Sequence, residues 1–170
     1  MLERNVAGLR AAALHSPRVR ELLGERFAFV SSAPVETKEP TAAAGGSPDV
    51  RLVFYSYTHN TAVDVRMHGT EMQSALQRKD EAPPEGQEEV AVAIALAERD
   101  PRLAGKLQGL NGNALIAFPA NDQLGFGHRV LDVTFTKEGV DLALYFALVD
   151  LTDQVVLVAG PTSERGRRQP

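Results

Sequence analysis

Histidine and carboxylate side chains gather in one short stretch of the sequence, at His59, Asp64 and His68. Asp64, Arg66 and His68 alternate with apolar residues, so a strand would place these three polar side chains on one face of a sheet. Two histidines and one carboxylate are enough to bind a metal ion or to perform acid–base chemistry. The simpler interpretation is a solvated sheet face with cross-strand charge pairing, and we predict no metal. His59, Asp64 and His68 are the candidates if a metal site exists.

The other residues that could do chemistry lack the context that catalysis needs. The glycines of GFGH, residues 125–128, lead into a β-like run, whereas a phosphate-binding glycine loop opens a helix. No serine stands in a Gly-x-Ser-x-Gly nucleophile elbow. Glu88 and Glu89 are adjacent, so they point to different sides of a helix and face its dipole in the first turn. We therefore predict no catalytic residue and no cofactor.

Composition and charge narrow the classes of partner. The formal net charge of −4 argues against a general nucleic-acid binder, which needs a basic face. The basic cluster RGRR, residues 165–168, indicates a solvated tail. The absence of cysteine excludes disulfides and thiolate zinc sites. No apolar run reaches the roughly 20 residues of a membrane span. If Met1 is the native start, we expect a cytoplasmic protein; otherwise the compartment is open.

Apolar spacing predicts helices before strands in the first half of the chain. An amphipathic helix over the first residues ends at Pro17, and residues 18–23 form a short second helix that stops near Gly24. The small, Gly- and Pro-rich residues 40–49 indicate a flexible loop. Period-2 alternation predicts strands at residues 27–34, 50–58 and 61–67.

The second half has the same predicted order. A helix begins with EEVAVAIALAE, and Val90, Ile94 and Leu96 mark its buried side. A short second helix follows near residues 101–107. About four strands come next, in the sequences NALIAFPA, HRVLDVTFT, VDLALYFALVDL and VVLVAG.

These patterns predict an α+β fold of two tandem units. Each unit would be a helix packed on an antiparallel sheet of about 3–4 strands. The charged segment 77–87, with its two adjacent prolines, marks the boundary. We place the first unit at residues 1–80 and the second, with a C-terminal tail, at residues 81–170.

The two halves also share sequence. SPRVRELLG in the first half is matched by DPRLAGKLQG in the second, with Pro17 on Pro101 and Arg18 on Arg102. RLVFYSYT and RVLDVTFT form a second pair, and AVDV could match LVDL. A repeat this long indicates a duplicated domain. Because the shared positions serve packing and the histidines have no counterpart, the repeat indicates a scaffold.

The end of the chain resembles the PepSY domain. That family typically ends in a strand, an Asp, a short turn and another strand. Here residues 149–151 contain the end of the first strand with its Asp, residues 152–154 are the turn, and residues 155–158 are the second strand. Gln154 or Val155 stands where the family usually has Gly. PepSY domains are thought to bind or inhibit proteins, so the resemblance implies a binding role.

A second resemblance spans roughly residues 1–160. The second and third N-terminal domains of copper amine oxidases are a tandem of cystatin-like units whose junction is similar to VDV, PP, EE and DPR, found here at residues 63–65, 83–84, 88–89 and 100–102. The resemblance implies two cystatin-like units with an accessory, interaction role. The oxidases carry their quinone tyrosine and copper-binding histidines in a large separate β-domain, which 170 residues are too few to include.

We therefore predict a non-catalytic protein-binding or oligomerisation module. The partner would be a second copy or another protein, with exposed strand edges as docking sites. The alternative is a small-molecule or metal-binding domain with a pocket on the concave sheet face. A cavity with convergent polar groups and His68 or His128 would favour the alternative, whereas an exposed apolar sheet face would favour an interface.

Overall fold

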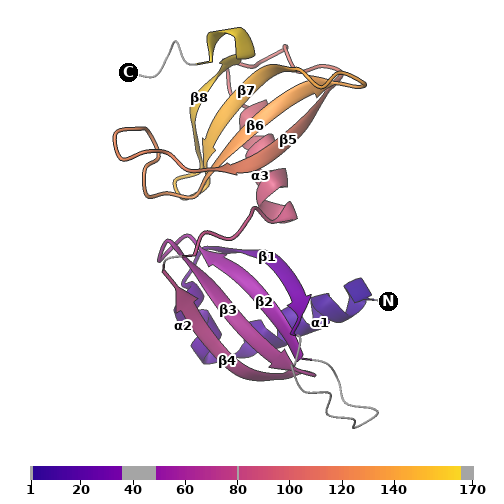
Figure 1. The fold of residues 1–170 in the computed structure, drawn as a ribbon, viewed down its shortest axis with the longest axis vertical. Coiled ribbons are helices and arrows are strands. Elements are labelled where there is room, and N and C mark those ends of the chain that lie inside the picture. Colours follow the sequence, from indigo (N-terminus) through magenta and orange to yellow (C-terminus); the bar gives the residue numbers. More distant parts are fainter. Residues whose placement is uncertain (1, 36–48, 80, 166–170) are drawn as a thin grey trace. The chain divides into compact units, whose positions relative to one another are not determined.

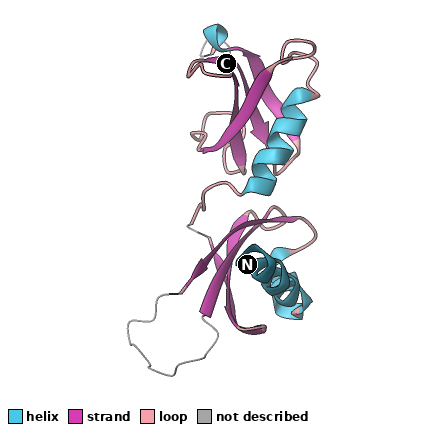
Figure 2. Cartoon of the chain, turned by 90° about the vertical axis from the view of Figure 1, so that its right-hand side faces the viewer, coloured by secondary structure: helices cyan, strands magenta, loops and turns pink. Residues whose placement is uncertain are grey.

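The computed structural model describes residues 2–35, 49–79 and 81–165. The chain divides into two compact units, Met1–Pro83 (unit 1) and Pro84–Pro170 (unit 2). Each unit holds one four-stranded antiparallel sheet with its helices against one face, as Figures 1 and 2 show. The predicted α+β fold of two tandem helix-plus-sheet units is confirmed. Among the described residues, no helix is long and apolar enough to cross a membrane.

Unit 1 contains two helices and a sheet in the order β1-β2-β3-β4. Ser16 caps the second helix by accepting a hydrogen bond from the Val19 N–H, and Gly24 ends it with φ 68°. The loop predicted at residues 40–49 lies outside the described residues apart from Asp49, which begins a strand. The elements are α1 (Leu2–His15), α2 (Pro17–Leu23), β1 (Phe27–Pro34), β2 (Asp49–Ser56), β3 (Thr61–His68) and β4 (Glu71–Arg78).

Strand β4 is missing from the sequence prediction. Its side chains are mostly exposed and polar, so it lacks the apolar alternation by which strands are found. The strand forms because Gly69, with φ 54°, turns the chain back and β4 pairs with β3 along its whole length. The core of unit 1 lies between the helices and the sheet face that they cover. It includes Leu9, Val19, Leu23, Leu52, Phe54, Val63 and Val65.

Unit 2 contains one α-helix and a sheet in the order β5-β6-β7-β8. The short second helix predicted near residues 101–107 is wrong, because the chain forms turns there and Gly105 has φ 71°. The elements are α3 (Gln87–Glu98), β5 (Leu110–Ala117), β6 (Val130–Lys137), β7 (Ala143–Asp150), β8 (Val155–Pro161) and the 3₁₀ helix η1 (Thr162–Glu164).

The buried stripe of α3 differs from the predicted one. Glu89, Ala93 and Ala97 are buried, whereas Val90, Ile94 and Leu96 are half-buried. The small alanines let the helix approach the sheet closely. A Cβ built on Gly112 of β5 would lie 3.0 Å from the Ile94 Cγ2, so that glycine makes room for the helix.

The predicted match between AVDV and LVDL does not hold in the strand registers. Ala62 pairs with Tyr55 beside the β2–β3 turn. Asp150 pairs with Val130, at the end of the β6–β7 pair that lies farthest from its turn. The two segments therefore occupy opposite ends of β3 and β7.

Candidate functional site

The structure does not bring His59, Asp64 and His68 together. His59 is exposed in the turn between β2 and β3, while Asp64 and His68 lie on the helix-free face of β3. Four residues along a strand span roughly 13 Å, too far for Asp64 and His68 to share a metal ion. Within the described parts of the chain, the group of three that could hold an ion is instead His128, Asp150 and Asp153.

Asp64 and His68 each take part in a different cross-strand charge pair. The His68 Nδ1 lies 2.8 Å from the Asp49 Oδ1, and these residues are direct partners on β3 and β2. The Asp64 Oδ2 accepts hydrogen bonds from the Arg51 Nε at 2.8 Å and Nη2 at 2.7 Å. Both pairs tie β2 to β3 on the helix-free face.

A hollow on this helix-free face of unit 1 forms the first candidate site. Its volume is about 620 Å³, within the range of small-molecule sites. Side chains from all four strands line it, since alternate residues of β2, β3 and β4 face away from the helices. We call it the arginine groove, and its lining is Ala33, Pro34, Val35, Arg51, Asp64, Arg66, Ser74, Leu76, Arg78 and Glu81.

Two carboxylates hold two of the three arginines of the groove. Asp64, whose side chain is only 14% exposed, pairs with Arg51 and lies 3.8 Å from the Arg78 Nε. Glu81 lies 3.5 Å from the Arg51 Nη2 and 3.9 Å from the Arg78 Nε. These four residues form one network along one side of the groove.

The third arginine stands outside this network. Arg66 is exposed and is the direct cross-strand partner of Arg51, so two positive side chains face each other on the same surface. Among the residues that the structure describes, Arg66 makes no ion pair. Like charges directly opposite in a sheet are unfavourable.

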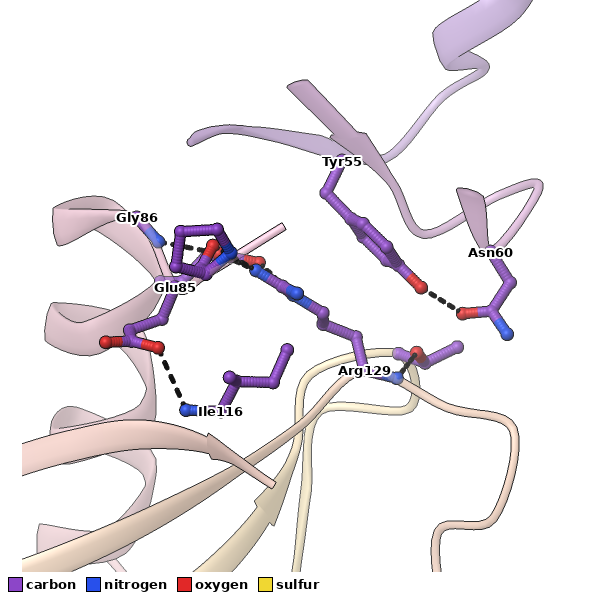
Figure 3. Close-up of polar contacts among 9 residues, drawn as sticks. Tyr55, Asn60, Glu85, Gly86, Ile116 and Arg129 are labelled. Carbon is purple, nitrogen blue, oxygen red and sulfur yellow. Dashed lines mark hydrogen bonds and ion pairs between the residues drawn. The ribbon is translucent and has the colours of Figure 1, made fainter. Parts of the chain in front are cut away.

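Unit 2 contains a fully buried ion pair between α3 and Arg129, the residue before β6. The Arg129 Nη2 lies 2.7 Å from the Glu89 Oε2, and both side chains are at most 1% exposed. The Arg129 Nε donates to the Glu89 Oε1 at 2.9 Å, so the pair is bidentate. Glu89 also accepts from the Gly86 N–H, and Arg129 also donates to the Pro84 carbonyl, as Figure 3 shows in part.

This pair fastens the start of unit 2 to its sheet. The Arg129 backbone N–H donates to the Thr152 Oγ1, and the Arg129 carbonyl accepts from the Leu151 N–H, so the β7–β8 turn is joined as well. From the sequence, Glu89 is predicted only to face the helix dipole. Its spacing with Ala93 and Ala97, four residues apart on one helical stripe, is the signal that could have shown its burial.

His128 and Asp150 form a second polar cluster beside the buried pair. The His128 Nδ1 lies 2.6 Å from the Asp150 Oδ2, and this hydrogen bond raises the pKa of His128 above its usual value. The other oxygen of Asp150 accepts from the backbone N–H groups of Thr152 and Asp153. Because both oxygens of Asp150 are engaged within the chain, the cluster fastens the turn. Gln154 closes that turn with φ 57°, a conformation that favours glycine.

Side chains form hydrogen bonds with backbone groups at both edges of the unit 2 sheet. On β5 the Ile116 N–H donates to the Glu85 carboxylate at 3.0 Å (Figure 3). At the bulge of β8, Arg102 donates to the carbonyls of Val156 at 2.7 Å and Leu157 at 3.2 Å. These backbone groups are therefore not available to a strand added at either edge.

Asp100 holds Arg102 in place for this contact. Two hydrogen bonds join their side chains, both 2.7 Å long, and Asp100 also accepts from the Arg102 backbone N–H. The hydrogen bond with Arg102 lowers the pKa of Asp100, and the same bond raises the pKa of Arg102. The DPR sequence thus closes a sheet edge, whereas Arg18 of the matching SPR sequence pairs with Glu21 on its own helix.

The helix-free face of unit 2 is the second candidate site. Leu115, Asp132, Leu148 and Val158 are successive cross-strand partners from β5 to β8. Three of the four are apolar, and Leu115 is 59% exposed. Val155, the cross-strand partner of Asp150, is also exposed, as is Leu144 at the bulge of β7. We call these residues, without Asp132, the apolar face.

Most exposed apolar side chains of the molecule belong to unit 2. Among the described residues, nine of the ten large hydrophobic side chains that are exposed lie there, and only Leu76 lies in unit 1. Phe118 and Phe126, in the loop between β5 and β6, are 72% and 58% exposed. Sequence patterns assign faces of a strand, but they do not show which face is left uncovered.

The segment after β8 returns to the apolar face. The Arg165 guanidinium pairs with Asp132 and lies 5.1 Å from the centre of the Phe146 ring. The interpretation of RGRR as a solvated tail is therefore wrong for Arg165, and residues 166–168 lie outside the described residues. The contact matters because it neutralises the acidic side chain in the middle of the face.

Comparison with known protein families and with functionally characterised proteins finds no match to this sequence.

Proposed function

We propose that this chain is a non-catalytic binding module that self-associates through the apolar face of unit 2. The observation that carries the proposal is the exposure of this face. An antiparallel sheet normally keeps one face on its core and presents a polar second face to water. Here the second face presents Leu115, Leu144 and Val155 instead, and large exposed apolar patches mark interaction sites.

The polar clusters of unit 2 support a structural rather than a catalytic role. The Arg129–Glu89 pair is buried, and Asp150 uses both oxygens within its own turn. Glu85 and Arg102 occupy edge groups of β5 and β8, which disfavours pairing by strand addition. Side-chain packing on the sheet face is the mode of association that these contacts leave available.

Charge favours a second copy as the occupant of the apolar face. In a two-fold symmetric contact the same face meets itself, so any unpaired charge on it would repel its own counterpart. Asp132 is paired with Arg165, and Asp150 is paired with His128, so the acidic groups of the face are already compensated. Two such faces would pack as a β-sandwich, with the sheets about 10 Å apart.

The proposed binding role also draws on the resemblance to PepSY domains and to the accessory domains of copper amine oxidases. Both units order a helix before a four-stranded antiparallel sheet with strands in sequence order, which supports a duplicated, cystatin-like scaffold. In the oxidases such units are accessory, and PepSY domains are thought to bind or inhibit proteins.

Sedimentation velocity of the full chain over a range of concentrations tests the proposal. Wild-type protein should sediment as a dimer that dissociates on dilution. Leu115→Asp should sediment as a monomer, because each copy would bring a new, unpaired carboxylate to the contact. Leu76→Asp is the matched control, since Leu76 is 52% exposed on the helix-free face of the other unit and should leave the dimer intact.

Two results would overturn the proposal. One is a wild-type protein that stays monomeric at the highest concentration tested. The other is a dimer that survives Leu115→Asp but dissociates in Leu76→Asp, since that would place the contact on unit 1. Circular dichroism of both variants would establish that each remains folded.

A further inference from the structure

We infer that the arginine groove of unit 1 binds a small organic anion with a carboxylate head and an apolar body. This inference is independent of self-association, because it concerns the other unit. Among the described residues that line the groove, three arginines face two carboxylates, which leaves one positive charge. That balance differs in sign from the chain as a whole, whose formal net charge is −4.

Arg66 is the residue that the ligand would contact first. It faces Arg51 directly across β3 and β2, so two positive side chains lie on the same surface. Asp64 compensates the charge of Arg51, to which its Oδ2 is hydrogen-bonded, whereas Arg66 makes no ion pair among the described residues. Positions where a sequence breaks a local rule without compensation are frequently functional.

The carboxylates of the groove hold the neighbouring arginines in position. Asp64 and Glu81 fix Arg51 and Arg78 before any ligand arrives, so little side-chain entropy would be lost on binding. A guanidinium group presents two parallel N–H donors that match a carboxylate. The single excess positive charge matches a monoanion better than a doubly charged phosphate.

Apolar side chains from both edge strands account for the apolar body. Ala33 and Pro34 come from the end of β1, Val35 follows it, and Leu76 comes from β4, where it is the cross-strand partner of Asp64. Leu76 is the one large apolar side chain exposed among the described residues of unit 1. At about 620 Å³ the groove is large enough for a chain of several carbons beside the charged head.

Isothermal titration calorimetry with three probes tests the inference on the full chain. Octanoate supplies both the head and the body, octanamide lacks the charge, and inorganic phosphate lacks the body. We expect octanoate to bind with one site per chain and the other two probes to bind much more weakly. Arg66→Gln should weaken octanoate binding about tenfold or more, as expected for losing a charge-assisted hydrogen bond.

Two further variants test whether octanoate binds in the arginine groove. Arg20→Gln removes an exposed arginine from α2, on the opposite side of the sheet, and should leave octanoate affinity unchanged. Leu76→Asp places a negative charge in the groove and should abolish octanoate binding while the protein remains a dimer.

The inference is overturned if octanoate produces no binding heat at millimolar concentration. It is also overturned if Arg66→Gln and Arg20→Gln change the affinity equally. Phosphate binding as tight as octanoate binding would contradict the assigned ligand class. Because Leu115→Asp should retain octanoate affinity, failure of this inference and failure of self-association give different results.

Discussion

The two units share an architecture and differ in the face that it leaves uncovered. Each sheet runs in sequence order, with its helices on one side. The free face of unit 1 is charged and hollowed, with Arg51, Arg66 and Arg78 across its strands. The free face of unit 2 is apolar and exposed around Leu115. The shared scaffold therefore does not determine what each unit contacts, because outward-facing strand residues change without disturbing the core.

The interiors differ as well. Unit 1 packs two helices on its sheet and fills the space with apolar side chains, Phe54 and Leu23 among them. The described residues of unit 2 contain a single α-helix, and the Glu89–Arg129 pair lies where that helix begins. A polar network thus secures the start of unit 2, whereas packing of α1 and α2 secures the start of unit 1. Substitutions can test each side of this comparison.

The largest expected effect comes from breaking the buried pair. Glu89→Gln leaves the Arg129 guanidinium buried without its carboxylate, which costs about 3–5 kcal/mol. In urea denaturation followed by intrinsic fluorescence and circular dichroism, the unfolding transition of unit 2 should shift to lower denaturant. The transition of unit 1 should stay where it is, since unit 1 contains no part of this pair.

Glu88→Gln is the matched control for that substitution. Glu88 is the exposed neighbour of Glu89 in the first turn of α3, so its substitution should change stability by less than about 0.5 kcal/mol. Equal effects of Glu88→Gln and Glu89→Gln would mean that the buried pair does not stabilise unit 2.

A smaller effect is expected at the matched arginines of the two halves. Arg102→Ala removes the donors to the Val156 and Leu157 carbonyls, whereas Arg18→Ala removes an exposed helical pair with Glu21. Arg102 is itself 39% exposed, so solvent screening reduces its contribution to about 1–2 kcal/mol, against less than about 0.5 kcal/mol for Arg18.

Aggregation provides a second readout for these arginines. An opened β8 edge can pair with another chain, so Arg102→Ala should scatter light earlier on heating than Arg18→Ala. Identical stability and identical scattering in the two variants would show that the repeated arginines play the same role in both units.

The smallest effect is a pH dependence of the unit 2 transition. Asp150 raises the pKa of His128 in the folded protein, so protonated His128 stabilises the fold. This contribution is fully present below the unfolded value of about 6.5 and is lost as pH rises through the raised folded pKa. Because His128 is 38% exposed, we expect less than about 1 kcal/mol.

Urea unfolding at about pH 6 and about pH 9 measures this difference. His128→Gln should reduce the pH dependence of the unit 2 transition. His68→Gln removes the corresponding Asp–His contact from unit 1 and should leave the unit 2 transition as pH-dependent as in the wild type. A His128→Gln variant with the full wild-type dependence would show that His128 is not responsible.

The sequence was sufficient for elements whose apolar residues are periodic. It found α1, α2, α3 and the strands with buried alternate residues, because burial on one face imposes a period. It missed β4, whose residues are mostly polar, and it assigned the wrong stripe to α3, where alanines are the buried residues. In both cases the contacts that hold the element come from elsewhere in the chain.

The candidate sites could not be predicted from the sequence of any one strand. Arg66 was recognised as part of a polar face, but Arg51 and Arg78 join it only through the registers of β2, β3 and β4. Glu89 and Arg129 are far apart in the sequence, and charged residues are exposed by default. Periodicity predicts on which face of a helix or strand a residue lies, but only the fold shows which residues of other elements lie beside it.

The most direct test of the difference between the two faces is a pair of amide NMR titrations on the wild-type chain. Adding octanoate should shift amide resonances around Arg51, Arg66 and Ser74, and diluting the protein should shift those around Leu115 and Leu148. These responses would assign anion binding to unit 1 and self-association to unit 2. Shifts from both titrations in the same unit, or no response to either, would contradict the account.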